Sequence, residues 1–388
     1  MSNAPLSLPV IEQLIAFDTT SRNTNLECIA FIQSLLDDAG IEPILVHDDT
    51  GTKANLYATL GPADRSGYAL SGHTDVVPVD GQDWSSDPFT VRRENDRLYG
   101  RGTSDMKSFI GVCLALTPEF LAREIETPLH LCFSYDEEIG CIGVRGLLDY
   151  LREQPVRPKG CIIGEPTMMG VMRAHKGKLS HRCTVHGHAS HSSLTHQGVN
   201  AVEAAAETIA YLKSMARRLR DHGPYDRDYD PPHTTVHTGL IRGGTQLNIV
   251  PSECFFDFEF RHLPVDDPLA LFSEVQRFVA EHVLPEMHAT NPDTGFDWSM
   301  LSHSPGLNTD EDAPITQLCK ALTGANHTGT VAFGTEAGLF SADDMPAIVC
   351  GPGSIEQAHK PDEYIEIGQI AECERFIRRL FERCWGSG

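Results

Sequence analysis

The stretch Ser71-Gly72-His73-Thr74-Asp75 follows a short apolar run, Tyr68-Ala69-Leu70, which is typical of the end of a buried strand. His73 and Asp75 are two residues apart, so an extended backbone would turn both side chains to one face. A histidine that ligates a metal usually has a carboxylate nearby that orients its ring or the backbone around it. We therefore predict that this strand end contributes to a metal site, with Asp75 behind His73.

Four later segments also bring a carboxylate or a histidine to the end of a predicted strand or to the start of a helix. Together with the first segment they supply the candidate ligands, which are His73, Asp105, Glu138, Glu165 and His359. Two divalent ions about 3.5–4 Å apart typically need one bridging carboxylate and one or two terminal ligands each, and this set is sufficient. Imidazole with carboxylate favours zinc, and cobalt or manganese would also fit.

Two glutamates, Glu137 and Glu138, follow the apolar strand expected at 129–135. Neighbouring residues cannot easily bind the same ion, so one of them can ligate while the other acts as a general base. The glycine-rich loop that ends in Asp105 precedes a helix expected at 107–121. Such a loop could cradle phosphate, but neither the Walker pattern nor a dinucleotide fingerprint is present, so we expect it to let Asp105 approach a metal.

Strands alternate with helices at both ends of the chain, which is typical of an α/β fold with a mostly parallel sheet and helices on both faces. In such sheets functional groups gather beyond the carboxyl ends of the strands. In the middle of the chain, helices expected at 198–219 and 268–283 lie among strands of antiparallel character, which predicts an inserted α+β domain. The expected catalytic domain therefore has two parts and the insertion lies between them, at residues 1–178, 304–388 and 179–303 respectively.

Composition limits the possible partners of the chain. A length of 388 residues suggests two domains, and the formal net charge of −23 argues against nucleic acid or an anionic membrane. The 11 cysteines are scattered without close pairs, which favours a reducing compartment over a disulfide framework. Residues 1–5 lack a basic region leading into an apolar core, so we expect that they are not a secretory signal, and no apolar run is long enough to cross a bilayer. We expect a cytoplasmic enzyme.

The sequence resembles the aminoacylase and carboxypeptidase family of two-zinc metallohydrolases over nearly the whole chain. The resemblance rests on five motifs, which are Ser71 to Asp75, Gly102 to Lys107, Asp136-Glu137-Glu138, Ile163 to Thr167 and Gly351 to Tyr364. It implies a zinc-binding α/β domain with an inserted lid that often dimerises.

The same resemblance implies a role for each residue of the metal site. Asp105 would bridge two metals, with His73 and Glu165 on one ion and Glu138 and His359 on the other. Glu137 would be the catalytic acid and base.

The resemblance also implies roles for residues in the insertion and after it. His191 would reach a neighbouring active site, and Asn248 and Arg261 would hold the substrate carboxylate. Thr335 would belong to a substrate loop of the kind found in the deacetylases. Each has a plainer alternative: His191 could be a structural histidine, Arg261 could pair with an acid of its own sheet, and Glu336 beside Thr335 could cap a helix.

The implied activity is deacetylation of an N-acetyl amino acid, first of all N2-acetyl-L-ornithine to L-ornithine plus acetate in arginine biosynthesis. The alternatives within the family are desuccinylation of succinyl-diaminopimelate, dipeptide hydrolysis and deacetylation of acetylcitrulline. A non-catalytic binding protein that keeps the fold is the alternative of another class, although no ligand is missing. A serine hydrolase is disfavoured because no Gly-x-Ser-x-Gly elbow is present. We expect each chain to bind two divalent ions, with Zn²⁺ as the expected metal and Co²⁺ as the alternative. We also expect a homodimer through the inserted domain.

Overall fold

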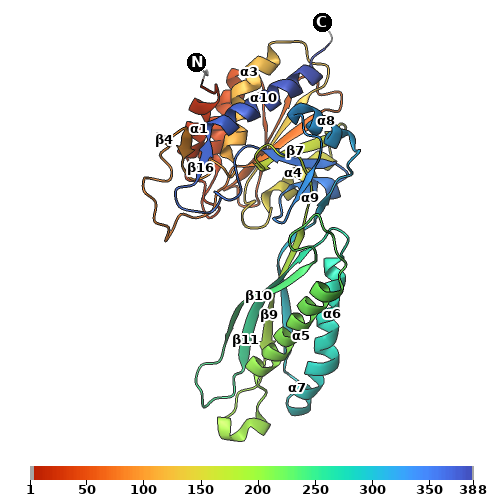
Figure 1. Cartoon of the computed structure of the whole chain (residues 1–388). Coiled ribbons are helices and arrows are strands. Elements are labelled where there is room, and N and C mark those ends of the chain that lie inside the picture. The colour runs from red at the N-terminus through yellow and green to blue at the C-terminus, as the bar shows by residue number, and fades with distance from the viewer. Residues whose placement is uncertain (1–3, 387–388) are drawn as a thin grey trace. The chain divides into compact units, whose positions relative to one another are not determined.

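The structure, a computed structural model, describes residues 4–386 and divides into two compact units (Figure 1). The first unit contains the chain up to Ala174, Leu307–Thr330 and the residues from Thr335 onward. The second contains His175–Gly306 with Val331–Gly334. That residues 179–303 form an independent lid domain stays a prediction. The expectation about a secretory signal rests partly on residues 1–3, which lie outside the described part.

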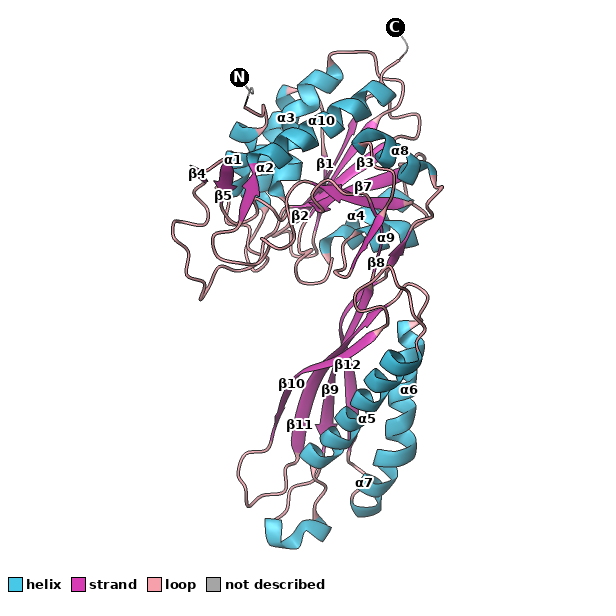
Figure 2. Cartoon of the chain, in the orientation of Figure 1, coloured by secondary structure: helices cyan, strands magenta, loops and turns pink. Residues whose placement is uncertain are grey.

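Within residues 4–386, one sheet of nine strands forms the centre of the first unit (Figure 2). Its order is β1-β2-β6-β3-β7-β15-β8-β13, with β14 beside β8. The strands are β1 (Ile44–His47), β2 (Ala54–Leu60), β3 (Tyr68–His73), β6 (Leu129–Ser134), β7 (Gly160–Pro166), β8 (Met172–His175), β13 (Leu307–Asn308), β14 (Gly329–Val331) and β15 (Ala347–Gly351). The four central strands from β6 to β15 pair in parallel, whereas β1, β2 and β8 pair antiparallel.

Apolar side chains on both faces of this sheet are covered by helices. Leu70 and Ile162 belong to one buried cluster, whereas their neighbours Ala69 and Cys161 belong to another, as the two-residue period of a strand requires. The first cluster includes residues of α1 (Leu8–Ile15), α2 (Leu26–Asp38), α3 (Lys107–Leu121), α8 (Pro314–Thr323) and α10 (Ile367–Cys384). The second includes residues of α4 (Gly143–Arg152) and α9 (Ala337–Ala342). The predicted α/β class, with helices on both faces, is confirmed.

A small sheet in the first unit was not expected from the sequence. It has the order β16-β5-β4 and consists of β4 (Arg92–Glu94), β5 (Arg97–Tyr99) and β16 (Tyr364–Glu366). These strands are only three residues long, so they carry too little periodicity to be recognised. Through this sheet, Tyr364 pairs with Tyr99 although the two lie far apart in the chain.

The second unit is an antiparallel sheet with helices packed along it (Figure 2). The sheet has the order β10-β11-β9-β12, and its strands are β9 (Gly177–His186), β10 (Thr235–Gly243), β11 (Glu253–His262) and β12 (Gly295–Ser304). Side chains alternate between buried and more exposed along β11, because only one face of the sheet is covered.

The helices of the second unit are α5 (Ala201–His222), α6 (Pro268–Phe278) and α7 (Leu284–Thr290). Asn200 caps α5 by accepting from the backbone N–H groups of Val202 and Glu203. The helix predicted at 268–283 continues instead through a π-helical turn, η2 (Val279–Val283), into α7. A separate finding concerns membranes: no helix within residues 4–386 is long and apolar enough to span one.

Candidate metal centre

The five predicted ligands meet at the carboxyl ends of the parallel strands of the first unit. β3 ends at His73, and Glu165 lies near the end of β7. Glu138 follows β6 and His359 follows β15, while Asp105 lies in the loop that leads into α3. Neighbouring parallel strands present their carboxyl ends at one edge of a sheet, and this brings together residues that are far apart in sequence.

Asp105 lies between two histidines. Its Oδ1 is 3.0 Å from Nε2 of His73, and its Oδ2 is 3.4 Å from Nε2 of His359. The carboxylate is buried. A carboxylate whose two oxygens face two different imidazoles has the arrangement that a bridging ligand needs.

Each histidine also has a glutamate of its own. Nε2 of His73 is 3.5 Å from Oε1 of Glu165, and Nε2 of His359 is 3.1 Å from Oε2 of Glu138. Two groups of three residues each offer ligand atoms that lie within 4.8 Å of one another. One group is His73, Asp105 and Glu138, and the other is His73, Glu137 and Glu165. The donors therefore form one cluster in which each histidine has a separate carboxylate partner.

Asp75 connects the strand end of His73 to the turn that carries the two glutamates. The Nδ1 atom of His73 is 2.9 Å from the backbone carbonyl oxygen of Asp75, which leaves Nε2 free to ligate. The Asp75 carboxylate accepts from the backbone N–H groups of Glu137 at 3.1 Å and Glu138 at 3.3 Å. The hydroxyl of Ser21 donates to the same carboxylate at 2.7 Å. Asp75 thus acts on the site through other residues, because it fixes the backbone from which the Glu137 and Glu138 side chains extend.

The three acids of the turn after β6 point to different partners. Asp136 forms an ion pair with Lys53 and does not belong to the ligand cluster. Glu137 lies in the cluster with His73, and its Oε1 accepts from the thiol of Cys141 at 3.2 Å. Glu138 faces His359.

Burial and crowding change the protonation of these groups. Burial raises the pKa of Glu137 to about 8, opposed by His73 and reinforced by the charge of Glu138. Burial and the charge of Asp105 raise the pKa of Glu138 to about 7. Hydrogen bonds to Asp105 and Glu138 raise the pKa of His359 to about 10. Burial also raises the pKa of Glu165 well above its ordinary range, with repulsion from Asp105 in the same direction.

This donor set fits divalent metal ions. Imidazole nitrogens and carboxylate oxygens are ligands that zinc accepts. Burial and mutual repulsion disfavour the ionised form of the clustered carboxylates, and bound cations would stabilise that form. The residues that would hold the ions are His73 with Glu165, His359 with Glu138, and Asp105 between them.

The second unit brings together two of the three residues predicted for it. His191 forms a β-bridge with Ile249, and the carbonyl oxygen of Asn248 accepts from the backbone N–H of Ser192 at 3.1 Å. Arg261 lies elsewhere, near the end of β11, and donates to Oε1 of Glu259 at 3.1 Å. Cys254 pairs with Gly243 at the start of β11, so roughly 23 Å of strand separates that end from Arg261. The plainer alternative for Arg261, an ion pair with an acid of its own sheet, is present, and Asn248 lies at the opposite end of the sheet. That Asn248 and Arg261 hold the substrate carboxylate stays a prediction.

Thr335 and Glu336 lie inside the first unit. The hydroxyl of Thr335 is buried and accepts from the backbone N–H of Ala337 at the start of α9. Glu336 is also buried, and Ser134 and Ser71 donate to its two carboxylate oxygens. Burial raises the pKa of Glu336 to about 7. Thr335 therefore contacts the first turn of α9, and Glu336 links the start of α9 to Ser71 and Ser134. Contact between Thr335 and the substrate stays a prediction.

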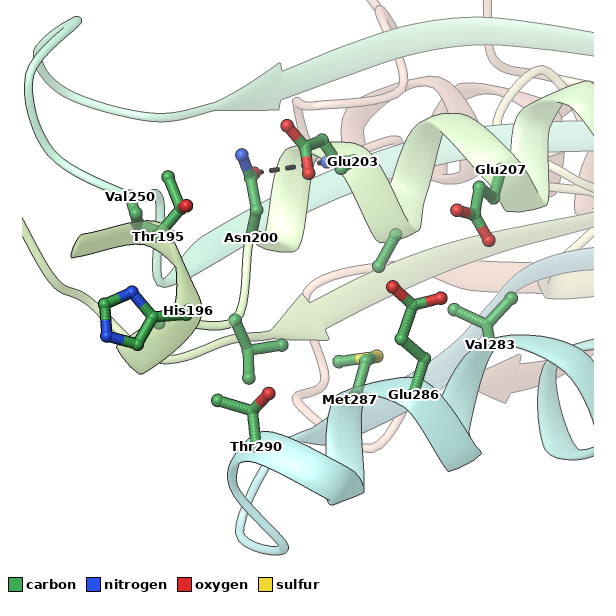
Figure 3. Close-up of a pocket in the computed structure, with 13 residues that line it drawn as sticks. Thr195, His196, Asn200, Glu203, Glu207, Val250, Val283, Glu286, Met287 and Thr290 are labelled. Carbon is green, nitrogen blue, oxygen red and sulfur yellow. Dashed lines mark hydrogen bonds between the residues drawn. The ribbon is translucent and has the colours of Figure 1, made fainter. Parts of the chain in front are cut away.

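A cavity of about 320 Å³ lies within the second unit, and Figure 3 shows its lining. It is bordered by the start of α5, by η2 and α7, and by the segment at 195–200, with Glu203, Glu207 and Glu286 among its polar residues. It contains none of the predicted ligands or substrate-binding residues. We therefore do not assign the predicted chemistry to this cavity.

Sequence reasoning missed the groups that hold the ligand loops. Glu363, four residues after His359, is buried and accepts from three backbone N–H groups of the loop that carries Asp105. Arg101 is buried beside it. The signal was present, because Glu363 lies inside the same motif as His359, but a carboxylate in a polar loop is ordinarily solvated.

Two histidines with a carboxylate between them and further buried acids at the strand ends of an α/β sheet form a candidate centre for two metal ions. A family model for the peptidase family M20/M25/M40 matches residues 69–383, and the chain belongs to this family. It is accordingly an enzyme, a metal-dependent amidohydrolase.

Similar proteins with assigned functions are acetylornithine deacetylases. The one from Photorhabdus laumondii is 32% identical over 394 residues, with 97% of each chain covered. The one from Myxococcus xanthus is 32% identical over 389 residues, which is 99% of this chain and 98% of the relative. The family predicted from the motifs is confirmed.

Solved structures of the family share the fold at low sequence identity. An M20 metallo-carboxypeptidase from Sulfolobus solfataricus superposes with a TM-score of 0.75 at 17% identity, covering 97% of this chain and 98% of its own. A dinuclear metal-binding M20 peptidase from Bacillus subtilis gives 0.68 at 13% identity, with 97% of both chains covered. These likenesses support the fold and the mixed α/β assignment.

Proposed function

We propose that the chain hydrolyses N2-acetyl-L-ornithine to L-ornithine and acetate, a step of arginine biosynthesis. The observation that carries amide hydrolysis is the position of Asp105, whose two oxygens face His73 and His359. Support for the substrate comes from the relatives, because acetylornithine deacetylases match this chain over nearly its full length. All 11 cysteines are buried thiols that take part in no disulfide, which supports a reducing, cytoplasmic setting.

The cofactor in this proposal is a pair of divalent ions, with Zn²⁺ as the expected metal and Co²⁺ as an active substitute. His73 and Glu165 would hold one ion, Glu138 and His359 the other, and Asp105 would bridge them. Such ions polarise an amide carbonyl and lower the pKa of a water.

The chain's own residues supply the proton transfers. Glu138 pairs with His359, whereas the Glu137 carboxylate lies in the cluster and accepts from the thiol of Cys141, so we assign the acid–base work to Glu137. It would take a proton from the attacking water and return it to the leaving amine. Asp75 keeps the backbone of Glu137 in place while this happens.

A homodimer through the second unit completes the proposal. Asn248 and Arg261 lie near opposite ends of one sheet, so they could hold the same substrate carboxylate only if one came from a partner. The edge strands β10 and β12 expose Ile241, Met300 and Leu301, and an unpaired edge of this kind favours pairing with a second copy. His191, beside Asn248, would then stabilise the developing oxyanion in the partner's site.

A substrate panel tests the proposed activity. Acetylornithine, acetylcitrulline, succinyl-diaminopimelate and several dipeptides would be offered to the protein with added zinc or cobalt. The proposal expects acetylornithine to have the highest kcat/KM. Faster turnover of a succinylated or dipeptide substrate would assign the chain to another activity of the same family.

A further inference from the structure

Glu363 makes an unusual set of contacts with the loop that precedes Asp105. Its Oε1 accepts from the backbone N–H groups of Ser104 at 2.8 Å and of Gly102 and Asp105 at 3.1 Å. Its Oε2 accepts from Nη1 of Arg101 at 2.6 Å. Both side chains of this ion pair are almost fully buried. One carboxylate therefore fixes the backbone on which Asp105 is mounted.

The same group of residues extends to His359. Nη2 of Arg101 donates to Oε1 of Gln82 at 2.7 Å, and Nε2 of Gln82 donates to the carbonyl oxygen of His359 at 3.0 Å. The indole N–H of Trp84 donates to the same Gln82 oxygen at 3.0 Å. A continuous chain of hydrogen bonds thus runs from the Asp105 loop to the backbone of His359.

His359 needs such support because packing does not hold its ring. Its side chain is 53% exposed, and its φ of +63° lies in the left-handed region that residues other than glycine seldom adopt. The backbone around it is fixed by its neighbours instead. Ser104 and Ser354 exchange hydrogen bonds at 3.0 and 3.1 Å, and the pairing of β16 with β5 holds the segment that follows.

We propose that Glu363 is a positioning residue that holds the Asp105 loop and the His359 segment in one geometry, so that both residues can bind the same divalent ion. Glu363 lies behind Asp105 and acts on the metal only through the backbone of its neighbours. The inference rests on the proposed two-metal site and adds to it the residue that sets the spacing of the ligands.

The test is the metal affinity of metal-free protein, measured by competition with a chelator for Zn²⁺. Glu363→Gln keeps the shape but turns an N–H donor toward Arg101 or toward the backbone N–H groups, so the contacts cannot all form. Groups behind metal ligands typically change affinity by about 10–100-fold, and we expect a loss in this range for at least one ion. A folded Glu363→Gln protein that binds both ions as the wild type does would overturn the proposal.

Glu374→Gln is the matched control. Glu374 is a buried carboxylate that accepts from the backbone N–H and hydroxyl of Ser7 at 2.8 and 2.9 Å, and from Arg378 at 3.0 Å. These partners belong to the two ends of the chain and lie outside the loops that carry the ligands. This variant should lose stability but keep the wild-type affinity for zinc. Equal loss of affinity in both variants would show a general effect of damaging the core, contrary to the proposal.

Gln82→Ala decides the matter if Glu363→Gln fails to fold. Gln82 is not fully buried, so its removal should leave the fold intact while breaking the link to His359. A smaller loss of zinc affinity in the same direction supports the proposal, and wild-type affinity contradicts it. Because the readout is metal binding, failure to hydrolyse acetylornithine would refute the proposed substrate without affecting this result. A wild-type chain that binds no divalent ion would contradict both.

Discussion

Replacing Glu137 by alanine should separate metal binding from turnover. Asp75 holds the backbone N–H groups of Glu137 and Glu138, and this contact does not depend on the Glu137 side chain. Glu138 should therefore still face His359, at the 3.1 Å separation seen here, and metal content should stay at the wild-type level. The proton transfers, in contrast, lose their carrier. General acid–base groups contribute typically about 10²–10⁴-fold, which corresponds to roughly 3–5 kcal/mol of activation free energy.

The assay combines elemental analysis of the purified variant with initial rates of acetylornithine hydrolysis. Asp136→Asn is the matched control, because Asp136 is the adjacent acid but pairs with Lys53 outside the ligand cluster. The control should keep its metal and most of its rate. If Glu137→Ala loses metal in proportion to activity, Glu137 is a ligand and the roles of the two glutamates are wrongly assigned.

Three further changes have expected outcomes. His359→Ala should weaken one ion more than the other, because His359 faces Glu138 and only one oxygen of Asp105; titration with zinc would then show two unequal affinities, and equal weakening would contradict the assignment. Mixing inactive His191→Ala with inactive Glu137→Ala should restore part of the activity if His191 acts across a dimer, whereas a mixture that exchanges subunits and stays inactive refutes that role. Burial lowers the pKa of His130 from 6.5 to about 4, so the folded protein resists protonation of this ring more than the unfolded chain does. The free energy of unfolding should therefore be highest above pH 6.5 and fall as the pH is lowered toward 4, by about 3 kcal/mol for this group. Denaturant unfolding of His130→Gln should show a correspondingly weaker pH dependence between pH 6.5 and 4.

The clustering of the candidate ligands could be predicted because it follows from a general property of α/β sheets. His73 ends a strand of the parallel centre of the sheet, and Glu138 and His359 follow two others, so sequence patterns that end in these residues also predict that they meet. The parallel centre of the sheet followed from the alternation of strands and helices. The helices and strands of the second unit were likewise recognisable from their periodicity, up to the π-helical turn that carries the chain from α6 into α7.

The supporting contacts could not be predicted, because they depend on exact three-dimensional placement. Glu363 accepts a hydrogen bond from the backbone N–H of Ser104, 259 residues away. It directly precedes β16, which belongs to a small sheet whose strands are too short to show a period. Asp75 was expected behind His73, but its hold on the backbone of both glutamates depends on how the turn after β6 folds. Thr335 matched a substrate-loop pattern, and only the structure shows that its side chain is buried at a helix start.

An anomalous difference map from crystals grown with zinc shows most directly whether Asp105 lies between two metal ions. We predict two peaks about 3.5–4 Å apart on either side of the Asp105 carboxylate. One peak should lie beside His73 and Glu165, and the other beside Glu138 and His359. A single peak, or zinc bound without contact to Asp105, would contradict a two-metal site bridged by this residue.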